Sequence, residues 1–254
     1  MAIEIRNVSK VYGNKKVVDN VSLTIPQGKI TSFIGPNGAG KSTLLAIISR
    51  LLMADDGKVC LNGRLIHEQN SEDVARQLSI LKQSNHISLR LTVEELVAFG
   101  RFPYSKGNLT KTDRTFINNA IDYMDLNEIR SQYIDTLSGG QRQRAYIAMT
   151  LAQDTDYILL DEPLNNLDMK HSVQIMQILR KLTNELNKTV VIVIHDINFA
   201  SCYSDYIVAM REGKLVCQGK VADIMQEAVL HQIYDMKIPI REIGNHKIGV
   251  YFRT

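Results

Sequence analysis

A glycine-rich segment that ends in a lysine and a serine carries the strongest chemical signal in the sequence. It reads Gly35-Pro36-Asn37-Gly38-Ala39-Gly40-Lys41-Ser42 and fits the pattern G-x-x-x-x-G-K-[ST]. A β-rich run precedes it and a helical pattern begins near Lys41. Successive backbone N–H groups of such a loop form a nest for phosphates, and the helix N-terminus adds its dipole. The segment predicts a nucleotide site in which Lys41 reaches the β- and γ-phosphates, Ser42 ligates Mg²⁺ and Thr43 hydrogen-bonds another phosphate oxygen. The alternative is a glycine-rich turn that only caps a helix.

Two carboxylates at the end of an apolar run would supply the second half of such a site. Asp161 and Glu162 directly follow Tyr157-Ile158-Leu159-Leu160. Phosphoryl transfer to water needs a carboxylate for Mg²⁺ and a group that orients and deprotonates the attacking water. We assign Asp161 to the metal and Glu162 to the water. Such a pair is commonly a solvated strand end, but the phosphate loop favours the functional interpretation.

The elements that must position these residues form one α/β pattern. Runs typical of strands occur at 3–8, 17–25, 30–34, 78–81, 157–160 and 189–194, and hairpins are expected at 59–63, 206–217 and 237–252. Apolar residues between 173 and 186 recur every three or four positions, which indicates an amphipathic helix. Strand–helix–strand with apolar strands is typical of a parallel sheet covered on both faces. From about 84 to 155 the apolar spacing is helical, which predicts a helical insertion.

The composition excludes several classes of protein. The 254 residues include 30 Lys+Arg and 27 Asp+Glu, a net charge of +3, with 44% hydrophobic residues. These values argue against a disordered, collagen-like or disulfide-scaffold chain. No basic stripe is evident, so no nucleic-acid partner is expected. No apolar run approaches the ~20 residues of a membrane helix, and no signal-peptide pattern is present, so we expect the chain in the cytoplasm. The three scattered cysteines are expected to be apolar fillers.

A second glycine pair precedes another predicted helix. The pentapeptide reads Leu137-Ser138-Gly139-Gly140-Gln141. Ser138 and Gln141 have the spacing of a capping box, which alone would explain their identity. The glycines permit close approach of an anion to the helix N-terminus. With this pentapeptide about twenty residues before Asp161, the sequence resembles the ATP-binding cassette family. The resemblance implies that Ser138, Gly139, Gly140 and Gln141 of one subunit cover the γ-phosphate held by another, and therefore a head-to-tail homodimer with two composite sites.

Four further positions match motifs of this family, and their roles are implied by the resemblance. Tyr12 matches the aromatic residue that stacks on adenine, and Gln83 matches the glutamine that touches Mg²⁺ and senses the membrane partner. His195 matches the histidine that contacts the γ-phosphate. Asn166-Leu167-Asp168 occupies the loop that crosses the dimer seam, where many relatives have Ala-Leu-Asp; Asp168 is retained, and only the preceding contact is in doubt. Taken singly, Tyr12 could be an edge-strand residue and His195 a locally satisfied strand end.

The resemblance also implies the fold and the ligands. We expect an α/β fold: a P-loop NTPase core with a parallel sheet, an antiparallel β subdomain and an inserted helical signature subdomain. The chain would be one ATPase domain, with the RecA-like core and antiparallel part at about 1–83 and 156–254 and the helical subdomain at about 84–155. The ligands would be ATP and Mg²⁺. Catalysis is assigned to Lys41, Gln83, Glu162 and His195, and the metal to Ser42, Gln83 and Asp161. ATP binding is assigned to Tyr12, residues 35–43, residues 138–141 and Asp168.

No site for a substrate that would accept the phosphoryl group is evident. ATP hydrolysis is therefore expected to drive motion of a partner protein. The segment 91–104, with Gly100-Arg101-Phe102-Pro103, is similar to ATPase subunits of importers for iron–siderophore complexes, haem and vitamin B12. Its structural alternative is an amphipathic helix that ends at Gly100, with Pro103 preventing continuation. The segment 162–172 resembles the ferric-siderophore branch, with catecholate-type siderophores as the expected cargo. The resemblance implies a peripheral protein on the cytoplasmic face of the membrane, bound to integral membrane permease subunits and indirectly served by a substrate-binding protein.

Other functions stay open at this point. The cargo could be haem or vitamin B12. A soluble cassette ATPase acting on ribosomes or DNA usually has two cassettes or a long coiled coil, whereas this chain has one signature, no repeat and no sustained heptads. A small-molecule phosphotransferase would need a second pocket and usually a lid. Export is a further alternative, and it is less favoured because exporters of this family are often fused to membrane helices.

Overall fold

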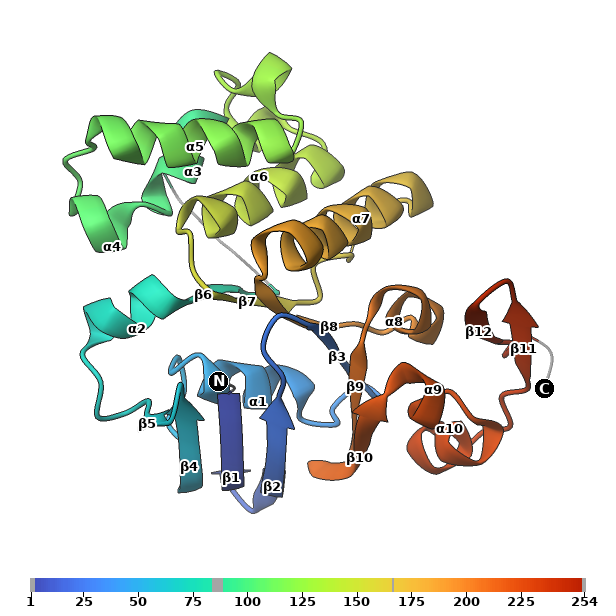
Figure 1. Ribbon diagram of the computed structural model, residues 1–254. Helices are drawn as coiled ribbons and strands as arrows, with labels where there is room; N and C mark the ends of the chain where they lie inside the picture. The colour runs from blue at the N-terminus through green and yellow to red at the C-terminus, as the bar shows by residue number, and fades with distance from the viewer. Residues whose placement is uncertain (1–2, 84–88, 166, 253–254) are drawn as a thin grey trace. The chain divides into compact units, whose positions relative to one another are not determined.

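The computed structural model describes residues 3–83, 89–165 and 167–252 (Figure 1). The chain divides into two compact units. The first contains Met1–Gln69 and Thr189–Thr254, and the second contains Asn70–Lys188. Within the described residues, none of the helices is both long enough and apolar enough to cross a membrane.

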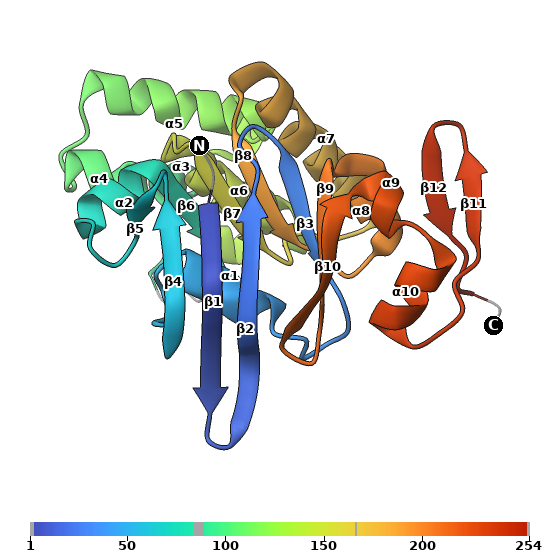
Figure 2. The ribbon, with the colours of Figure 1, turned by 60° about the horizontal axis from the view of Figure 1, so that its bottom comes forward.

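The first unit contains an antiparallel sheet in the order β2-β1-β4-β5. Its strands are β1 (Ile3–Tyr12), β2 (Lys15–Ile25), β4 (Asp56–Leu61) and β5 (Arg64–Leu65). Figure 2 shows β1 between β2 and β4. Along β1, Ile3, Ile5 and Val8 are buried while Glu4 and Arg6 are not, the pattern of a strand with one covered face.

The first unit also holds four strands in the order β10-β9-β3-β8. They are β3 (Ile30–Ile34), β8 (Thr189–Val193), β9 (Tyr206–Arg211) and β10 (Lys214–Lys220). β3 pairs in parallel with β8 and β9, and its Phe33 lies opposite Val193 and Val208. All residues of β3 and β8 are buried, as expected for parallel strands covered on both faces.

Helices and a hairpin complete the first unit. They are α1 (Lys41–Ile48), α8 (Ile197–Tyr203), α9 (Val221–Ile224), α10 (Glu227–Tyr234) and the hairpin β11 (Ile240–Ile243) with β12 (His246–Gly249). α1 buries Leu44, Leu45, Ile47 and Ile48 completely. Burial of each such side chain contributes roughly 1.5–3 kcal/mol, so this face fixes the helix that follows the glycine-rich segment.

The second unit is mostly helical. The parallel strands β6 (Leu78–Leu81) and β7 (Tyr157–Asp161) pair with Leu81 opposite Leu160. The helices are α2 (Ser71–Gln77), α3 (Val93–Phe99), α4 (Phe102–Ser105), α5 (Lys111–Tyr123), α6 (Gly139–Ala152) and α7 (Met169–Leu186), with short 3₁₀ turns at Asn127–Ile129 and Ile134–Thr136. α3, α5 and α6 pack against one another. The α/β fold class and the helical character of the insertion are therefore confirmed for the described residues.

Local sequence explains where several of these helices begin. Capping boxes start α3 (Thr92 with Glu95), α5 (Thr110 with Asp113) and α6 (Ser138 with Gln141). Gly100 ends α3 as expected. α3 does not continue past Gly100, and Pro103 lies in the first turn of a separate helix, α4, where a missing N–H costs no helical hydrogen bond.

Arg101 connects three parts of the second unit through a buried guanidinium. The side chain is 4% exposed; its Nε donates to Asp113 Oδ1 at 2.9 Å and its Nη1 donates to the carbonyl of Ala152 at 2.8 Å. The guanidinium also lies 4.0 Å from the ring centroid of Tyr104 and 4.3 Å from that of Phe116. The arginine of the Gly-Arg-x-Pro element is therefore a structural residue of the helical region.

Arg101→Ala is expected to lower the free energy of unfolding by about 3–5 kcal/mol, because it leaves the carboxylate of Asp113 buried without its cation. The hydroxyl and backbone N–H of Thr110 and then the guanidinium of Arg101 hold the pKa of Asp113 below its usual value. The measurement is urea denaturation. As a control, Lys106→Ala breaks an exposed pair with Glu72, which solvent screens, and should cost far less. Equal losses in the two variants would contradict the assignment.

Candidate nucleotide site

The glycine-rich segment forms a turn between β3 and α1 that only glycines can make at its narrow points. Gly35 has φ +136° and Gly40 has φ +95°, values that L side chains rarely adopt. A Cβ on Gly35 would overlap the carbonyl oxygen of Met210, and one on Gly40 would overlap that of Val17. The backbone of the loop is therefore packed directly against β9 and β2, which fixes its shape.

Lys41 places its cationic end inside this loop. Its side chain is buried, and Nζ donates to the carbonyls of Gly35 at 2.8 Å and Pro36 at 2.9 Å. Ser42 and Thr43 follow in the first turn of α1, which carries no acidic residue. The helix dipole and the ammonium of Lys41 therefore both favour an anion at the loop. The arrangement is compatible with the predicted phosphate site.

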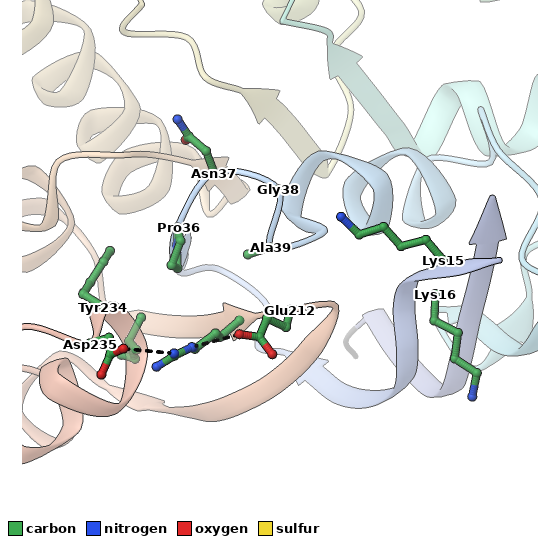
Figure 3. A pocket seen from close by; sticks show the side chains of 11 residues that line it. Lys15, Lys16, Pro36, Asn37, Gly38, Ala39, Glu212, Tyr234 and Asp235 are labelled. Atoms are coloured by element: carbon green, nitrogen blue, oxygen red, sulfur yellow. Dashed lines mark ion pairs between the residues drawn. The ribbon is translucent and has the colours of Figure 1, made fainter. Parts of the chain in front are cut away.

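A cavity of about 390 Å³ lies beside the loop (Figure 3). Its lining includes residues 36–39, Lys15, Lys16, Tyr234, and Arg211 with its acidic neighbours Glu212 and Asp235. Arg211 pairs with Glu212 and with Asp235, each at 3.5 Å, so its charge is largely balanced. Lys16 pairs with Asp19 at 3.0 Å, whereas no ion pair of Lys15 is found among the described residues.

Tyr12 lies at the same end of the β1–β2 hairpin as these lysines. It is opposite Lys15 in the strand register, the residue is 52% exposed, and Lys10 Nζ lies 5.8 Å from the ring centroid. An exposed aromatic ring of this kind can stack on a flat heterocycle. The position is compatible with the predicted adenine contact, which stays a prediction.

His195 follows β8 in the same unit. β8 runs parallel to β3, and the N–H of Ile194 donates to the carbonyl of Phe33 at 3.1 Å. His195 and the phosphate loop therefore leave the sheet at the same edge. His195 is exposed, and the next residue, Asp196, caps α8.

The second unit brings Gln83 and Glu162 into contact. They follow β6 and β7, whose carboxyl ends meet because the strands are parallel neighbours. Gln83 Nε2 donates to Glu162 Oε2 at 2.6 Å. Glu162 has φ +52°, an uncommon value for a non-glycine residue and one that recurs at functional sites. Asp161, half-buried at the end of β7, precedes it.

Asn165 is a functional candidate that the sequence patterns did not reveal. Its Nδ2 donates to the same oxygen of Glu162, and its backbone N–H bonds to the carbonyl of Glu162 at 3.2 Å. An amide three residues after an acid in a turn is the signal that could have indicated this contact. Glu162 Oε2 thus accepts from both Gln83 and Asn165, so both donors orient the carboxylate.

Asn165→Ala is expected to lower kcat by about three- to tenfold with little change in KM, because one neutral hydrogen bond to the carboxylate of Glu162 is lost. The measurement is steady-state ATP turnover. Asn165→Asp should lower kcat further, since the hydrogen-bond donor is replaced by a second carboxylate that repels that of Glu162. A kcat unchanged in both variants would contradict the orienting role.

Gly139 and Gly140, the two glycines of the pentapeptide 137–141, lie at the exposed start of α6. The N–H of Ser138 donates to Gln141 Oε1 at 3.0 Å and the N–H of Gln141 donates to Ser138 Oγ at 3.3 Å, so the capping box is formed. Gly139 is exposed and Gly140 half-buried, and the first turn has no acidic residue. The local explanation for Ser138 and Gln141 is therefore correct, and it leaves the helix start available to an anion.

Asp168 caps α7. Its Oδ1 accepts the backbone N–H of His171 at 2.8 Å, a bond that lowers the pKa of the carboxyl group. The departure from the family pattern at Asn166 lies outside the described residues. The predicted site residues are thus divided: Tyr12, the phosphate loop and His195 belong to the first unit, and the others to the second.

The residues assigned to Mg²⁺ offer the chemistry that this ion prefers. A hydroxyl from Ser42, a carboxylate from Asp161 and an amide oxygen from Gln83 are hard oxygen ligands, and Mg²⁺ in nucleotide sites is usually held by one or two protein groups plus phosphates and water. The donor set therefore fits the ion.

Similarity to known proteins identifies the family of this chain. The family model described as ABC transporter matches residues 18–165. The petrobactin import ATP-binding protein YclP of Bacillus subtilis is 60% identical over 250 residues, covering 98% of this chain and 99% of that protein. The petrobactin import ATP-binding protein FatE of Bacillus anthracis is 49% identical, covering 98% and 100%. Among solved structures, the dimeric post-hydrolysis state of the ATP-binding cassette MJ0796 bound to ADP and Pi has a TM-score of 0.77 and 31% identity, covering 86% of this chain and 98% of that one. The chain belongs to the ABC transporter family.

Proposed function

We propose that this chain is the ATP-binding and ATP-hydrolysing subunit that energises a membrane importer of ferric siderophores. The observation that carries the proposal is the 60% identity, along nearly the whole length of both chains, to a petrobactin import ATP-binding protein. Petrobactin or a similar catecholate-type siderophore is the proposed cargo. No residue of this chain is assigned a contact with the cargo, because the proposed subunit acts on permeases.

In the proposed reaction, residues 35–43 and Tyr12 bind ATP, and residues 138–141 and Asp168 of a partner subunit complete the site. Lys41 holds the β- and γ-phosphates. Mg²⁺, held through Ser42, Asp161 and Gln83, would neutralise charge that develops on the phosphates. Glu162 orients the attacking water and accepts its proton, and His195 contacts the γ-phosphate. Gln83 and Asn165 hold the Glu162 carboxylate in one orientation.

The proposed working unit is a head-to-tail homodimer. Support comes from the dimeric state of the MJ0796 cassette, whose fold this chain shares. When two subunits pair, the helical subdomain, at about 84–155, would transmit the accompanying movement to integral membrane permease subunits. The chain would then be a peripheral protein on the cytoplasmic face of the membrane, with a substrate-binding protein as an indirect partner. Neither haem nor vitamin B12 import is favoured by these relatives.

Uptake in a strain that lacks the gene tests this proposal. We expect growth on ferric petrobactin as the iron source to be lost, to return with the parental chain, and to stay lost with Lys41→Ala. A tagged parental chain should co-purify with permease subunits from solubilised membranes. Unchanged growth on every iron–siderophore source would contradict import, and loss of growth on haem alone would assign the cargo to haem. Co-purification with ribosomes in place of permeases would favour a soluble cassette ATPase.

A further inference from the structure

The hairpin β11–β12 is hydrogen-bonded to α8, the helix that begins just after His195. The Asn198 side chain bonds to both backbone groups of Gly249 in β12: Nδ2 donates to the carbonyl at 3.2 Å, and Oδ1 accepts the N–H at 2.8 Å. One turn further along α8, Ser201 Oγ donates to the carbonyl of Lys247 at 2.6 Å. The edge of a strand presents such groups unpaired unless another element covers them. Here α8 packs on β12 and covers that edge (Figure 1).

His195 is the single residue between two fixed segments. Before it, the N–H of Ile194 donates to the carbonyl of Phe33 in β3 at 3.1 Å. After it, Asp196 Oδ1 accepts the N–H of Asn198 at 2.7 Å, which caps α8. The backbone of His195 is therefore placed by the edge of the sheet on one side and by the first turn of α8 on the other.

α8 depends on its contacts because it is short. It has seven residues, and a helix of this length is marginal by itself. Buried apolar side chains hold one face of α8, and the bonds of Asn198 and Ser201 hold the hairpin against it. The chain after β12 meets the same turn, since the pKa of Tyr251 is raised by burial and, in addition, by the carboxylate of Asp196. All of these residues belong to the first unit.

We infer that Asn198 is a positioning residue, which holds the hairpin β11–β12 on α8 and thereby fixes the start of α8 and the place of His195. The inference rests on the proposed function, in which His195 contacts the γ-phosphate. Without the two bonds of Asn198, the first turn of α8 gains freedom, and His195 spends less time where it meets the phosphate. A misplacement of about 1 Å can cost up to ~hundredfold in rate, so a loose hairpin would slow hydrolysis.

Two substitutions and a matched control test this role. Asn198→Ala removes both bonds to Gly249 and keeps the cap of α8, which uses the backbone N–H. Ser201→Ala removes only the bond to Lys247. Asn119→Ala makes the same chemical change as the first variant at an exposed position of α5, in the other unit, and should behave like the parent. Thermal melting checks that all three fold, and Ser201→Ala carries the comparison if Asn198→Ala does not.

The readouts are ATP affinity and turnover of radiolabelled ATP by the full chain. We expect kcat to fall about tenfold in Asn198→Ala and about threefold in Ser201→Ala, within the range that misplacement of a contacting group allows. ATP affinity should stay within about twofold, because the substitutions leave the phosphate loop and Lys41 unchanged. In a His195→Ala background, adding Asn198→Ala should lower kcat by less than about twofold, since the group that it positions is already absent. A general structural defect would lower kcat equally in both backgrounds.

Equal losses of kcat in the two backgrounds would overturn the inference, and so would an unchanged kcat in Asn198→Ala or a parallel loss of ATP affinity. Amide hydrogen exchange gives a measurement that is independent of turnover. We expect exchange over 194–200 to be at least about threefold faster in Asn198→Ala, with exchange over 35–43 unchanged. If the parental chain hydrolyses no ATP, the proposed function fails instead. The exchange over 194–200 then decides the inference, and equal rates in Asn198→Ala and the parent overturn it.

Discussion

Glu162→Gln is expected to reduce ATP hydrolysis by at least about a hundredfold, the usual contribution of a general base. The amide cannot accept the proton of the attacking water, whereas its carbonyl oxygen can still accept the hydrogen bonds from Gln83 and Asn165. The local geometry and ATP binding should therefore survive. Without hydrolysis, ATP should hold two subunits together, and a stable dimer should appear.

Two measurements check this prediction: phosphate release at saturating ATP, and molecular mass in the presence and absence of ATP. Glu185→Gln is the matched control, because it makes the same chemical change at an exposed position near the end of α7 and should hydrolyse ATP at the parental rate. A Glu162→Gln chain that hydrolyses ATP as fast as the parent would show that another group deprotonates the water.

Lys41→Ala is expected to lower ATP affinity and hydrolysis by at least about a hundredfold, because a charge-assisted bond to phosphate in a sheltered loop is lost. The side chain is buried and its ammonium points at the carbonyls of Gly35 and Pro36, so an exposed lysine cannot replace it. Binding of a fluorescent ATP analogue and phosphate release measure the two effects.

The control for this substitution is Lys181→Ala, which removes an exposed lysine of α7 and should leave both quantities unchanged. The two main variants also differ from each other in a useful way. Glu162→Gln should bind ATP and pair, while Lys41→Ala should do neither. Full ATP affinity in Lys41→Ala would contradict the assignment of the phosphate loop.

The sequence could predict features that depend on neighbouring residues. The phosphate loop between β3 and α1, the capping box of Ser138 and Gln141, and the end of α3 at Gly100 are local, because backbone geometry and hydrogen bonds between residues a few positions apart decide them. The parallel strands could also be expected, since a strand buried on both faces needs an apolar run. The sequence patterns did not reveal that Pro103 lies in the first turn of a further helix, because a proline is equally suited to ending one helix and to beginning another.

Only the tertiary structure decided which distant side chains meet. Gln83 and Glu162 are 79 residues apart and touch because β6 and β7 are adjacent and parallel. Arg101 finds Asp113 and the carbonyl of Ala152 in the packed helices. Such contacts depend on strand order and helix packing, which a residue pattern does not encode locally. The sequence therefore determined the chemical groups and their local supports, and the fold decided which of them act together.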